Sequence, residues 1–164
     1  MSVMVRTSLR SGDPAGIEQL VRETGFFSAE EITIARELAN DGLALGTASH
    51  YRFALVDSGP QLAAYACYGR IPCTRSAWDL YWIAVAPRFQ GQHLGRGLLE
   101  HIESAVISAG GTQLHADTSS RAQYGPTRAF YAARGYRQAA EFPDFYCPGD
   151  GKIVFSKALG LAGG

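Results

Sequence analysis

Residues 85–99, VAPRFQGQHLGRGLL, join a buried strand to an amphipathic helix through a turn rich in glycine. The apolar run at 80–85 ends the strand, and leucines at helical spacing begin at Leu98. Such a turn points backbone N–H groups outward at the positive end of the helix dipole, which favours a phosphate or pyrophosphate. Arg88 and Arg96 would add side-chain donors. The stretch predicts a phosphate-binding loop; the alternative is an ordinary turn whose glycines only relieve crowding.

The glycine spacing excludes two common phosphate-binding motifs. No Gly-Lys-Ser/Thr follows, so the loop is not a P-loop. Gly91, Gly95 and Gly97 do not form the G-x-G-x-x-G fingerprint, and no strand with an acidic end follows at the expected distance. A dinucleotide-binding loop also normally follows the first strand of its domain. The sequence therefore predicts neither nucleotide motif.

Turn signals and hydrophobic spacing divide the rest of the chain into short strands and helices. Ser28 and Glu31 have the spacing of a capping box, Asp13 is the expected N-cap of an earlier helix, and Gly42 is an expected helix stop. We expect strands at 4–9, 51–56, 61–69, 80–85, 113–118, 136–142 and 153–156, helices at 14–24, 28–40, 95–109 and 126–134, and a hairpin loop at 143–151. Because hairpins are mixed with crossover helices, these elements predict a mixed sheet with helices on both faces.

Composition indicates a globular protein with no strong charge. The 164 residues are 46% hydrophobic, which predicts a single domain over 1–164, with a flexible tail at 158–164. The 15 basic residues balance 15 acidic ones. A neutral chain lacks the broad basic field that nucleic acids or anionic membranes attract, so we expect neither as a partner.

The cysteines and histidines favour a cytoplasmic protein without a metal. Cys67, Cys73 and Cys147 form no paired spacing, which favours reduced thiols over a disulfide framework or a zinc site. The histidines are scattered, and we expect no metal. The chain shows no signal-peptide pattern and no apolar run long enough to span a membrane.

The stretch at 85–99 resembles the acyl-CoA pyrophosphate loop of the GCN5-related N-acetyltransferase (GNAT) superfamily. That loop has the pattern Gln/Arg-x-x-Gly-x-Gly/Ala, with Gln90 first and Gly95 last in this chain, and His93 stands where the family usually has glycine. A side chain is tolerated at that position if φ is negative. Residues 92–97 also fit the pattern but leave a longer loop. Residues 130–136, FYAARGY, resemble the family's FYxxxGF segment, and the expected order of elements matches across nearly the whole chain.

The resemblance implies the GNAT fold, an α/β (α+β) architecture. This fold has a mixed sheet of six to seven strands, helices on both faces and a splayed central strand pair. Acetyl-CoA would be the cosubstrate, its pantetheine amides pairing with strand edges as an added strand does. The residues expected to contact it are Ile83, Ala84, Val85, Gln90, Gly91, Gln92, His93, Leu94, Gly95, Arg96 and Phe130.

The resemblance also implies two catalytic residues. In this family a substrate amine attacks the thioester carbonyl directly. Tyr131 matches the tyrosine that protonates the departing thiolate, and its alternative role is that of a core aromatic. Asp79, at the start of the expected central strand, is the candidate base, and its alternative role is that of a solvated carboxylate.

Five further residues are candidates for binding the substrate. Carboxylates and aromatic rings suit a cationic amine, and the candidates are Phe27, Asp117, Ser119, Asp144 and Tyr146. The alternatives are a hydrophobic staple for Phe27 and a plugged hairpin loop for Asp144 and Tyr146. The resemblance implies an N-acetyltransferase acting on a primary amine of a small molecule, amino acid or peptide. The alternative is a non-catalytic acyl-CoA-binding or regulatory module. Exposed strand edges make a homodimer an expectation.

Overall fold

The computed structural model describes residues 2–160 as a mixed sheet with helices. In chain order, the elements are α1 (Asp13–Thr24), α2 (Ala29–Leu45), η1 (Gly46–Ala48), β1 (Arg52–Ser58), β2 (Gln61–Arg70), β3 (Ala77–Val85), η2 (Pro87–Phe89), α3 (Leu94–Ser108), β4 (Gln113–Ser119), η3 (Ala122–Tyr124), α4 (Gly125–Ala133), β5 (Arg137–Cys147) and β6 (Asp150–Ala158). The strand order is β1-β2-β3-β4-β6-β5. Pairing is parallel for β3–β4 and antiparallel for β1–β2, β4–β6 and β5–β6, which confirms the expected fold class.

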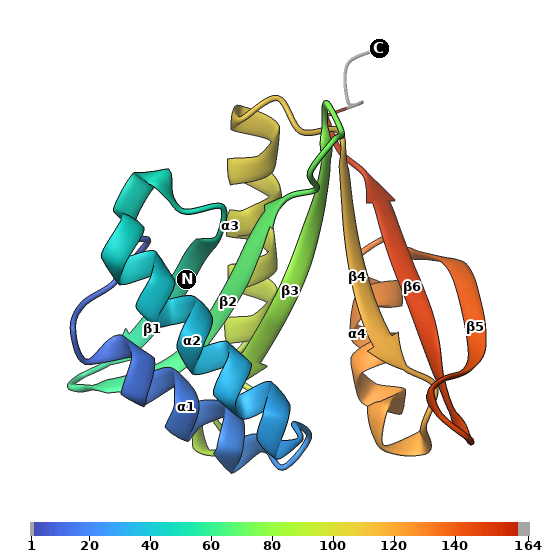
Figure 1. Ribbon diagram of the computed structural model, residues 1–164, viewed down its shortest axis with the longest axis horizontal. Coiled ribbons are helices and arrows are strands. Elements are labelled where there is room, and N and C mark those ends of the chain that lie inside the picture. The colour runs from blue at the N-terminus through green and yellow to red at the C-terminus, as the bar shows by residue number, and fades with distance from the viewer. Residues whose placement is uncertain (1, 161–164) are drawn as a thin grey trace. The chain divides into compact units, whose positions relative to one another are not determined.

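The chain divides into two compact units. Unit 1 comprises Met1–Gly69 and Trp82–Ser104, and unit 2 comprises Arg70–Tyr81 and Ala105–Gly164. In unit 1, α1 and α2 lie on one face of β1 and β2, and α3 lies on the other (Figure 1). The apolar faces of these elements form its core. The most deeply buried core residues, each at most 2% exposed, include Ile17, Leu20, Val21, Leu55, Tyr65, Leu98 and Ile102.

The helices of unit 1 begin and end differently from some expectations. Ser28 and Glu31 form the expected capping box at the start of α2. Gly12, not Asp13, is the N-cap of α1, and Asp13 is the first helical residue. Gly42 does not stop α2: a Cβ there would lie 2.7 Å from atoms of Leu9 and Phe53. The glycine lets the helix pack closely on those side chains, so α2 continues to Leu45.

The expected strand at 4–9 is wrong. Only Arg6 pairs, in an isolated antiparallel bridge with Leu55. Its guanidinium also lies 2.7 Å from a carboxylate oxygen of Asp13 and 2.9 Å from one of Asp57. Since these partners lie in α1 and β1, side-chain charge pairs hold the segment in place of a strand ladder.

In unit 2, the first half of β3 pairs with β4, and β4 pairs along its length with β6. Helix α4 covers one face (Figure 1). On that face, the Tyr131 ring stacks on that of Phe155 with 5.5 Å between the ring centroids. Ala116 is paired with Phe155, so the alternation of a strand puts the next residue, Asp117, on the opposite face. The Tyr131–Phe155 stack and the Asp117 carboxylate therefore lie on opposite faces of β4 and β6.

The expected loop at 143–151 is instead a long hairpin. Strand β5 continues to Cys147, β6 begins at Asp150, and a shift in register lies between Phe142 and Cys147. Gly149 supplies a φ of 84° at the turn, and its N–H donates to the Asp144 carboxylate at 2.7 Å. The turn is therefore short and held by its own side chain.

Leu159, near the end of the described residues, packs within unit 2. Ala158 belongs to β6 and Leu159 is only 4% exposed, so regular structure extends into the range expected for the tail. The Leu159 N–H donates to the Thr112 carbonyl at 2.8 Å. The rest of that expected tail, 161–164, lies outside the described residues.

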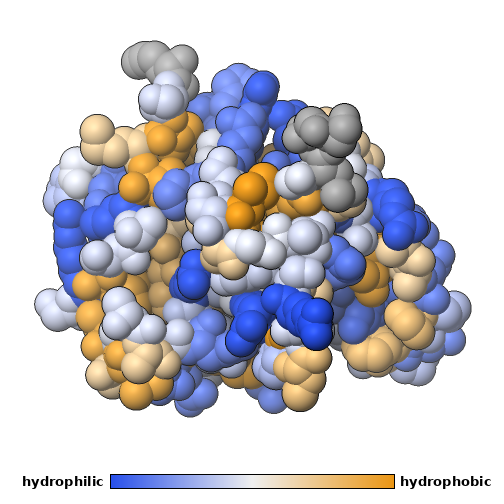
Figure 2. Space-filling view, turned by 90° about the horizontal axis from the view of Figure 1, so that it is seen from above, coloured by the Kyte–Doolittle hydropathy of each residue, from blue (hydrophilic) through white to orange (hydrophobic). Residues whose placement is uncertain are grey.

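The surface has one notable aromatic group. Phe142, Phe145 and Tyr146 of the β5–β6 hairpin are about half exposed. On the face drawn in Figure 2, hydrophilic and hydrophobic residues are interspersed. Within residues 2–160, no helix combines the length and apolarity that a membrane span requires.

Candidate functional site

The glycine loop of unit 1 connects β3 to α3 and is open to solvent. After the single turn of η2, residues 90–93 are exposed, and α3 begins at Leu94. The N–H groups of Leu94, Gly95 and Arg96 lie in the first turn of the helix, where no intrahelical carbonyl can accept them. Together with the helix dipole, these donors favour an anion. The loop is thus open to solvent at the start of a helix, and phosphate binding by it stays a prediction.

Two residues in the loop adopt left-handed backbone. Gly91 has φ 78° and His93 has φ 61°. The condition stated for a side chain at this position, a negative φ, is therefore not met at His93, and the chain takes a left-handed residue immediately before α3. Histidine is among the residues that tolerate this region, at a cost that glycine does not carry.

Side chains in and before the loop are already engaged. The Gln90 amide donates to the Val85 carbonyl at 3.3 Å, which ties the loop back to the end of β3. The Arg96 guanidinium donates to Glu100 at 2.8 Å along the exposed side of α3. Ile83, Ala84 and Val85 form the end of β3, and only Ala84 of the three is buried. Anion binding here would rest first on backbone N–H groups.

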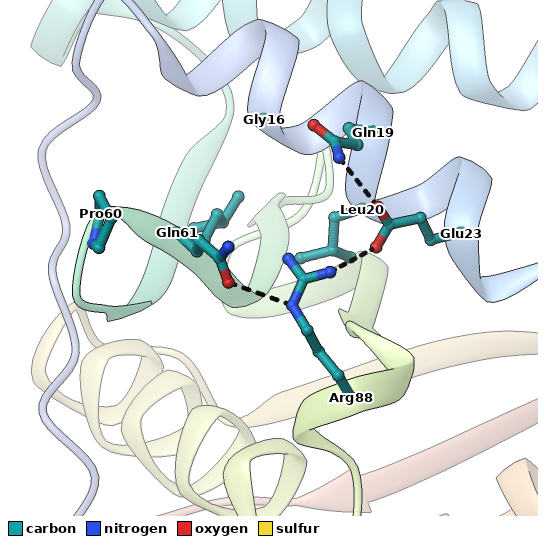
Figure 3. A pocket seen from close by; sticks show the side chains of 8 residues that line it. Gly16, Gln19, Leu20, Glu23, Pro60, Gln61 and Arg88 are labelled. Carbon is teal, nitrogen blue, oxygen red and sulfur yellow. Dashed lines mark hydrogen bonds and ion pairs between the residues drawn. The ribbon is translucent and has the colours of Figure 1, made fainter.

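A polar pocket lies beside η2 within unit 1 (Figure 3). Its volume is about 190 Å³, and its lining is Gly16, Gln19, Leu20, Glu23, Pro60, Gln61, Leu62 and Arg88. Arg88 donates to Gln61 at 3.2 Å and to Glu23 at 3.3 Å, and Gln19 donates to Glu23 at 2.9 Å. Because these side chains satisfy one another, they fix η2, and with it the start of the loop, against α1 and β2.

Tyr131 occupies the buried face of unit 2. Its side chain is 3% exposed, and its ring contacts the rings of Phe130, Tyr136 and Phe155. Burial, and secondarily the charge of Asp117, raise the pKa of the Tyr131 phenol above its usual value. The phenol is thus protonated at neutral pH and can donate a proton.

Asp79 belongs to a charged cluster in unit 2. It lies inside β3 rather than at its start and is half-buried. Burial raises the pKa of its carboxyl, Asp117 raises it further, and His115 and Lys152 oppose the rise. Asp117 is exposed and forms an ion pair with Lys152 at 3.1 Å. Sequence reasoning missed Lys152, whose position depends on the pairing of β4 with β6.

Three other candidate substrate residues of unit 2, Ser119, Asp144 and Tyr146, each make different contacts. The hydroxyl of Ser119 is buried and donates to Asp150, whose carboxylate is also 3.3 Å from Arg121. The Asp144 carboxylate caps its own hairpin. Tyr146 is half exposed, with its ring 5.1 Å from that of Phe145.

Phe27 lies in unit 1, with its ring centroid 5.4 Å from that of Trp82 on β3. It therefore packs on the strand that leads into the loop. No group of three or more His, Cys, Asp or Glu side chains within residues 2–160 is arranged to hold a metal ion.

Comparisons with known proteins agree with this arrangement. A family model described as "Acetyltransferase (GNAT) domain" matches residues 49–138. A protein from Desulfovibrio desulfuricans assigned to the GNAT acetyltransferases is 39% identical, with a TM-score of 0.94 over 97% of this chain and 100% of its own. No curated protein has significant similarity to the chain.

More distant structures share the fold. The ribosomal-protein-S18-alanine N-acetyltransferase of Escherichia coli is 24% identical, with a TM-score of 0.76 over 98% of this chain and 97% of its own. The PaiA N-acetyltransferase of Thermoplasma acidophilum, in complex with coenzyme A, is 19% identical, with a TM-score of 0.73 over 96% and 99%. At these identities the likeness concerns the fold alone.

Proposed function

Because the chain belongs to the GNAT family of acetyltransferases, we propose that it moves an acetyl group from acetyl-CoA to a primary amine. The acceptor is a small molecule, an amino acid or a peptide, and its amine attacks the thioester directly in a ternary complex. The observation that carries the proposal is the open loop at the N-terminus of α3, with its outward N–H groups. A protonated, buried Tyr131 supports a catalytic role beyond binding.

The loop residues bind the pyrophosphate of the cosubstrate. The first-turn N–H groups of Leu94, Gly95 and Arg96 donate to phosphate oxygens, and the left-handed residue Gly91 lets the backbone approach them. The backbone of 83–85 pairs with the pantetheine amides as one strand pairs with another. Phe130 contacts the same cosubstrate.

Asp79 removes the proton from the acceptor ammonium, directly or through water. An ammonium has no lone pair, so it must lose a proton before attack. The raised pKa of Asp79 makes its carboxylate a stronger base than an ordinary aspartate. Its half-buried position keeps it within reach of solvent.

Tyr131 donates a proton to the thiolate that leaves when the C–S bond breaks. A phenol suits this task because it stays protonated at physiological pH, and burial raises the pKa of Tyr131 further above its usual value. The helix-covered face of unit 2 holds its ring in one orientation through three aromatic contacts.

The alternative function, a non-catalytic acyl-CoA-binding module, is favoured by one observation. Three of the five candidate substrate residues are already paired within the chain: Asp117 with Lys152, Ser119 with Asp150, and Asp144 with the Gly149 N–H. An acceptor would have to compete with these partners for the three side chains.

A thiol-release assay separates the two functions. The full chain is mixed with acetyl-CoA and a library of primary amines, and free CoA is measured, while calorimetry measures acetyl-CoA binding. Release that depends on an added amine supports the enzyme. Binding without release supports the binding module, and the absence of both refutes the family role of the loop.

We place this activity in the cytoplasm. Cys67 is a buried thiol, and Cys73 and Cys147 are exposed thiols. Thiols that remain reduced are typical of that compartment.

A further inference from the structure

The ammonium group of Lys152 lies beside one carboxylate and two aromatic rings in unit 2. Its Nζ lies 3.1 Å from an Asp117 carboxylate oxygen, and its side chain is 22% exposed. The same Nζ lies 4.6 Å from the ring centroid of Phe145 and 6.0 Å from that of Phe142. A carboxylate together with aromatic faces is the set of groups that recognises a primary ammonium. The chain therefore presents its own amine to groups suited to an amine acceptor.

This amine belongs to the same charged cluster as the proposed base. Lys152 is paired with Ser119 across β4 and β6, and Asp117 is paired with Val154 two residues further along β6, so Lys152 and Asp117 share one face of the sheet. The charge of Asp117 raises the pKa of the Asp79 carboxyl, and the charge of Lys152 lowers it. After burial, the charge of Asp117 is the second cause that raises the pKa of the Tyr131 phenol. An amine and the groups proposed to handle its protons thus influence one another electrostatically.

Resting on the acetyl transfer proposed above, we propose that the protein acetylates the ε-amine of its own Lys152. The Asp117 carboxylate takes one proton from the ammonium, and the free amine attacks the carbonyl carbon of acetyl-CoA. The N–C bond forms and the C–S bond breaks. Of the two protons that the nitrogen loses, one is balanced by the proton that Tyr131 delivers to the thiol. The other passes from Asp117 to water, so the products are an amide, CoA and one proton.

The chain contains its own control, because Lys157 is its only other lysine. Lys157 lies on the same strand and is paired with Leu114, so it points to the face opposite Lys152. Its Nζ lies 5.5 Å from the ring centroid of Tyr136. Both lysines are partly exposed, so spontaneous acetylation by a thioester in solution would modify both.

Mass spectrometry of the full chain incubated with acetyl-CoA tests the proposal. We expect acetylation of Lys152 to be at least roughly tenfold faster than that of Lys157. The rate at Lys152 falls at least roughly tenfold in Tyr131→Phe and in Asp117→Asn, and it is unchanged in Lys157→Arg. The rate constant does not change on dilution, since the acceptor belongs to the same molecule. Thermal unfolding of each variant verifies that it is folded.

Equal rates at the two lysines, or a rate at Lys152 that rises with protein concentration, would overturn the proposal. Thiol release with external amines is measured on the same preparation. Release with an external amine but no acetyl group on Lys152 refutes this inference alone. No acetyl-CoA binding and no release with any amine refutes the proposed function as well.

Discussion

Replacing Tyr131 with phenylalanine removes one hydroxyl and keeps the ring. The stack on Phe155 at 5.5 Å and the edge contacts with Phe130 and Tyr136 survive the change. The free energy of unfolding should therefore change by only about 1 kcal/mol, the usual scale of one hydroxyl. The departing thiolate loses its proton donor, so kcat should fall at least roughly tenfold, or about 1.4 kcal/mol of barrier.

The pH dependence of this loss follows from burial. Because burial raises the pKa of Tyr131 above its usual value, the phenol stays protonated through the neutral and mildly alkaline range. The ratio of wild-type to variant kcat should therefore stay constant with pH up to about 10. CoA release with a saturating amine, followed across pH, measures this ratio.

Tyr136→Phe is the matched control for this experiment. Tyr136 is 4% exposed, its ring lies 5.6 Å from that of Tyr131, and the same hydroxyl is removed. Its kcat should remain near that of the wild type. Equal losses in the two variants, or an unchanged kcat in Tyr131→Phe, would remove Tyr131 from the mechanism.

Four other substitutions, of which Gly110→Ala is a control, test the loop, the base and the packing of α2. Gly91→Ala and Gly110→Ala place a side chain at φ 78° and 81° in open space, so thermal melts should show similar losses of about 1–2 kcal/mol, while only Gly91→Ala raises the KM for acetyl-CoA. Asp79→Asn should lower kcat and raise Tm at neutral pH, because a raised carboxyl pKa means that the folded state disfavours the charged form; the Tm difference should vanish as acid neutralises Asp79. Gly42→Ala would normally stabilise a helix, but the added Cβ meets Phe53 at 2.7 Å, so denaturant unfolding should show a loss of about 1–3 kcal/mol. A stabilised Gly42→Ala, a Gly91→Ala with normal KM, or an Asp79→Asn with full kcat would contradict these expectations.

Local signals predicted the start of α2 better than its end. The capping box of Ser28 and Glu31 marks the start of α2 because both partners lie within one helical turn. The end of α2 depends on Gly42 meeting Leu9 and Phe53, which are distant in sequence, so a glycine that reads as a stop becomes a close contact. Composition within a window cannot report such a contact.

The candidate site divides in the same way. The loop at 85–99 was predictable because strand end, turn and helix start are consecutive in the chain. Asp79 and Asp117 were singled out one at a time, but Lys152 was not, since its place beside Asp117 follows from the register of β4 against β6. The signal available was alternation: Lys152, Val154 and Ser156 are spaced by two, as residues on one strand face are.

Arg6 gives the first few residues an importance that their lack of regular structure conceals. Its guanidinium is the least exposed cation beside Asp13 and Asp57, since Arg10, the other partner of Asp57, is 68% exposed. Cutting the chain after this arginine would leave two sheltered carboxylates to repel each other at the junction of α1 and β1. A protein shortened in this way would therefore be less stable where α1 meets β1. The N-terminal stretch should be kept in any engineered form.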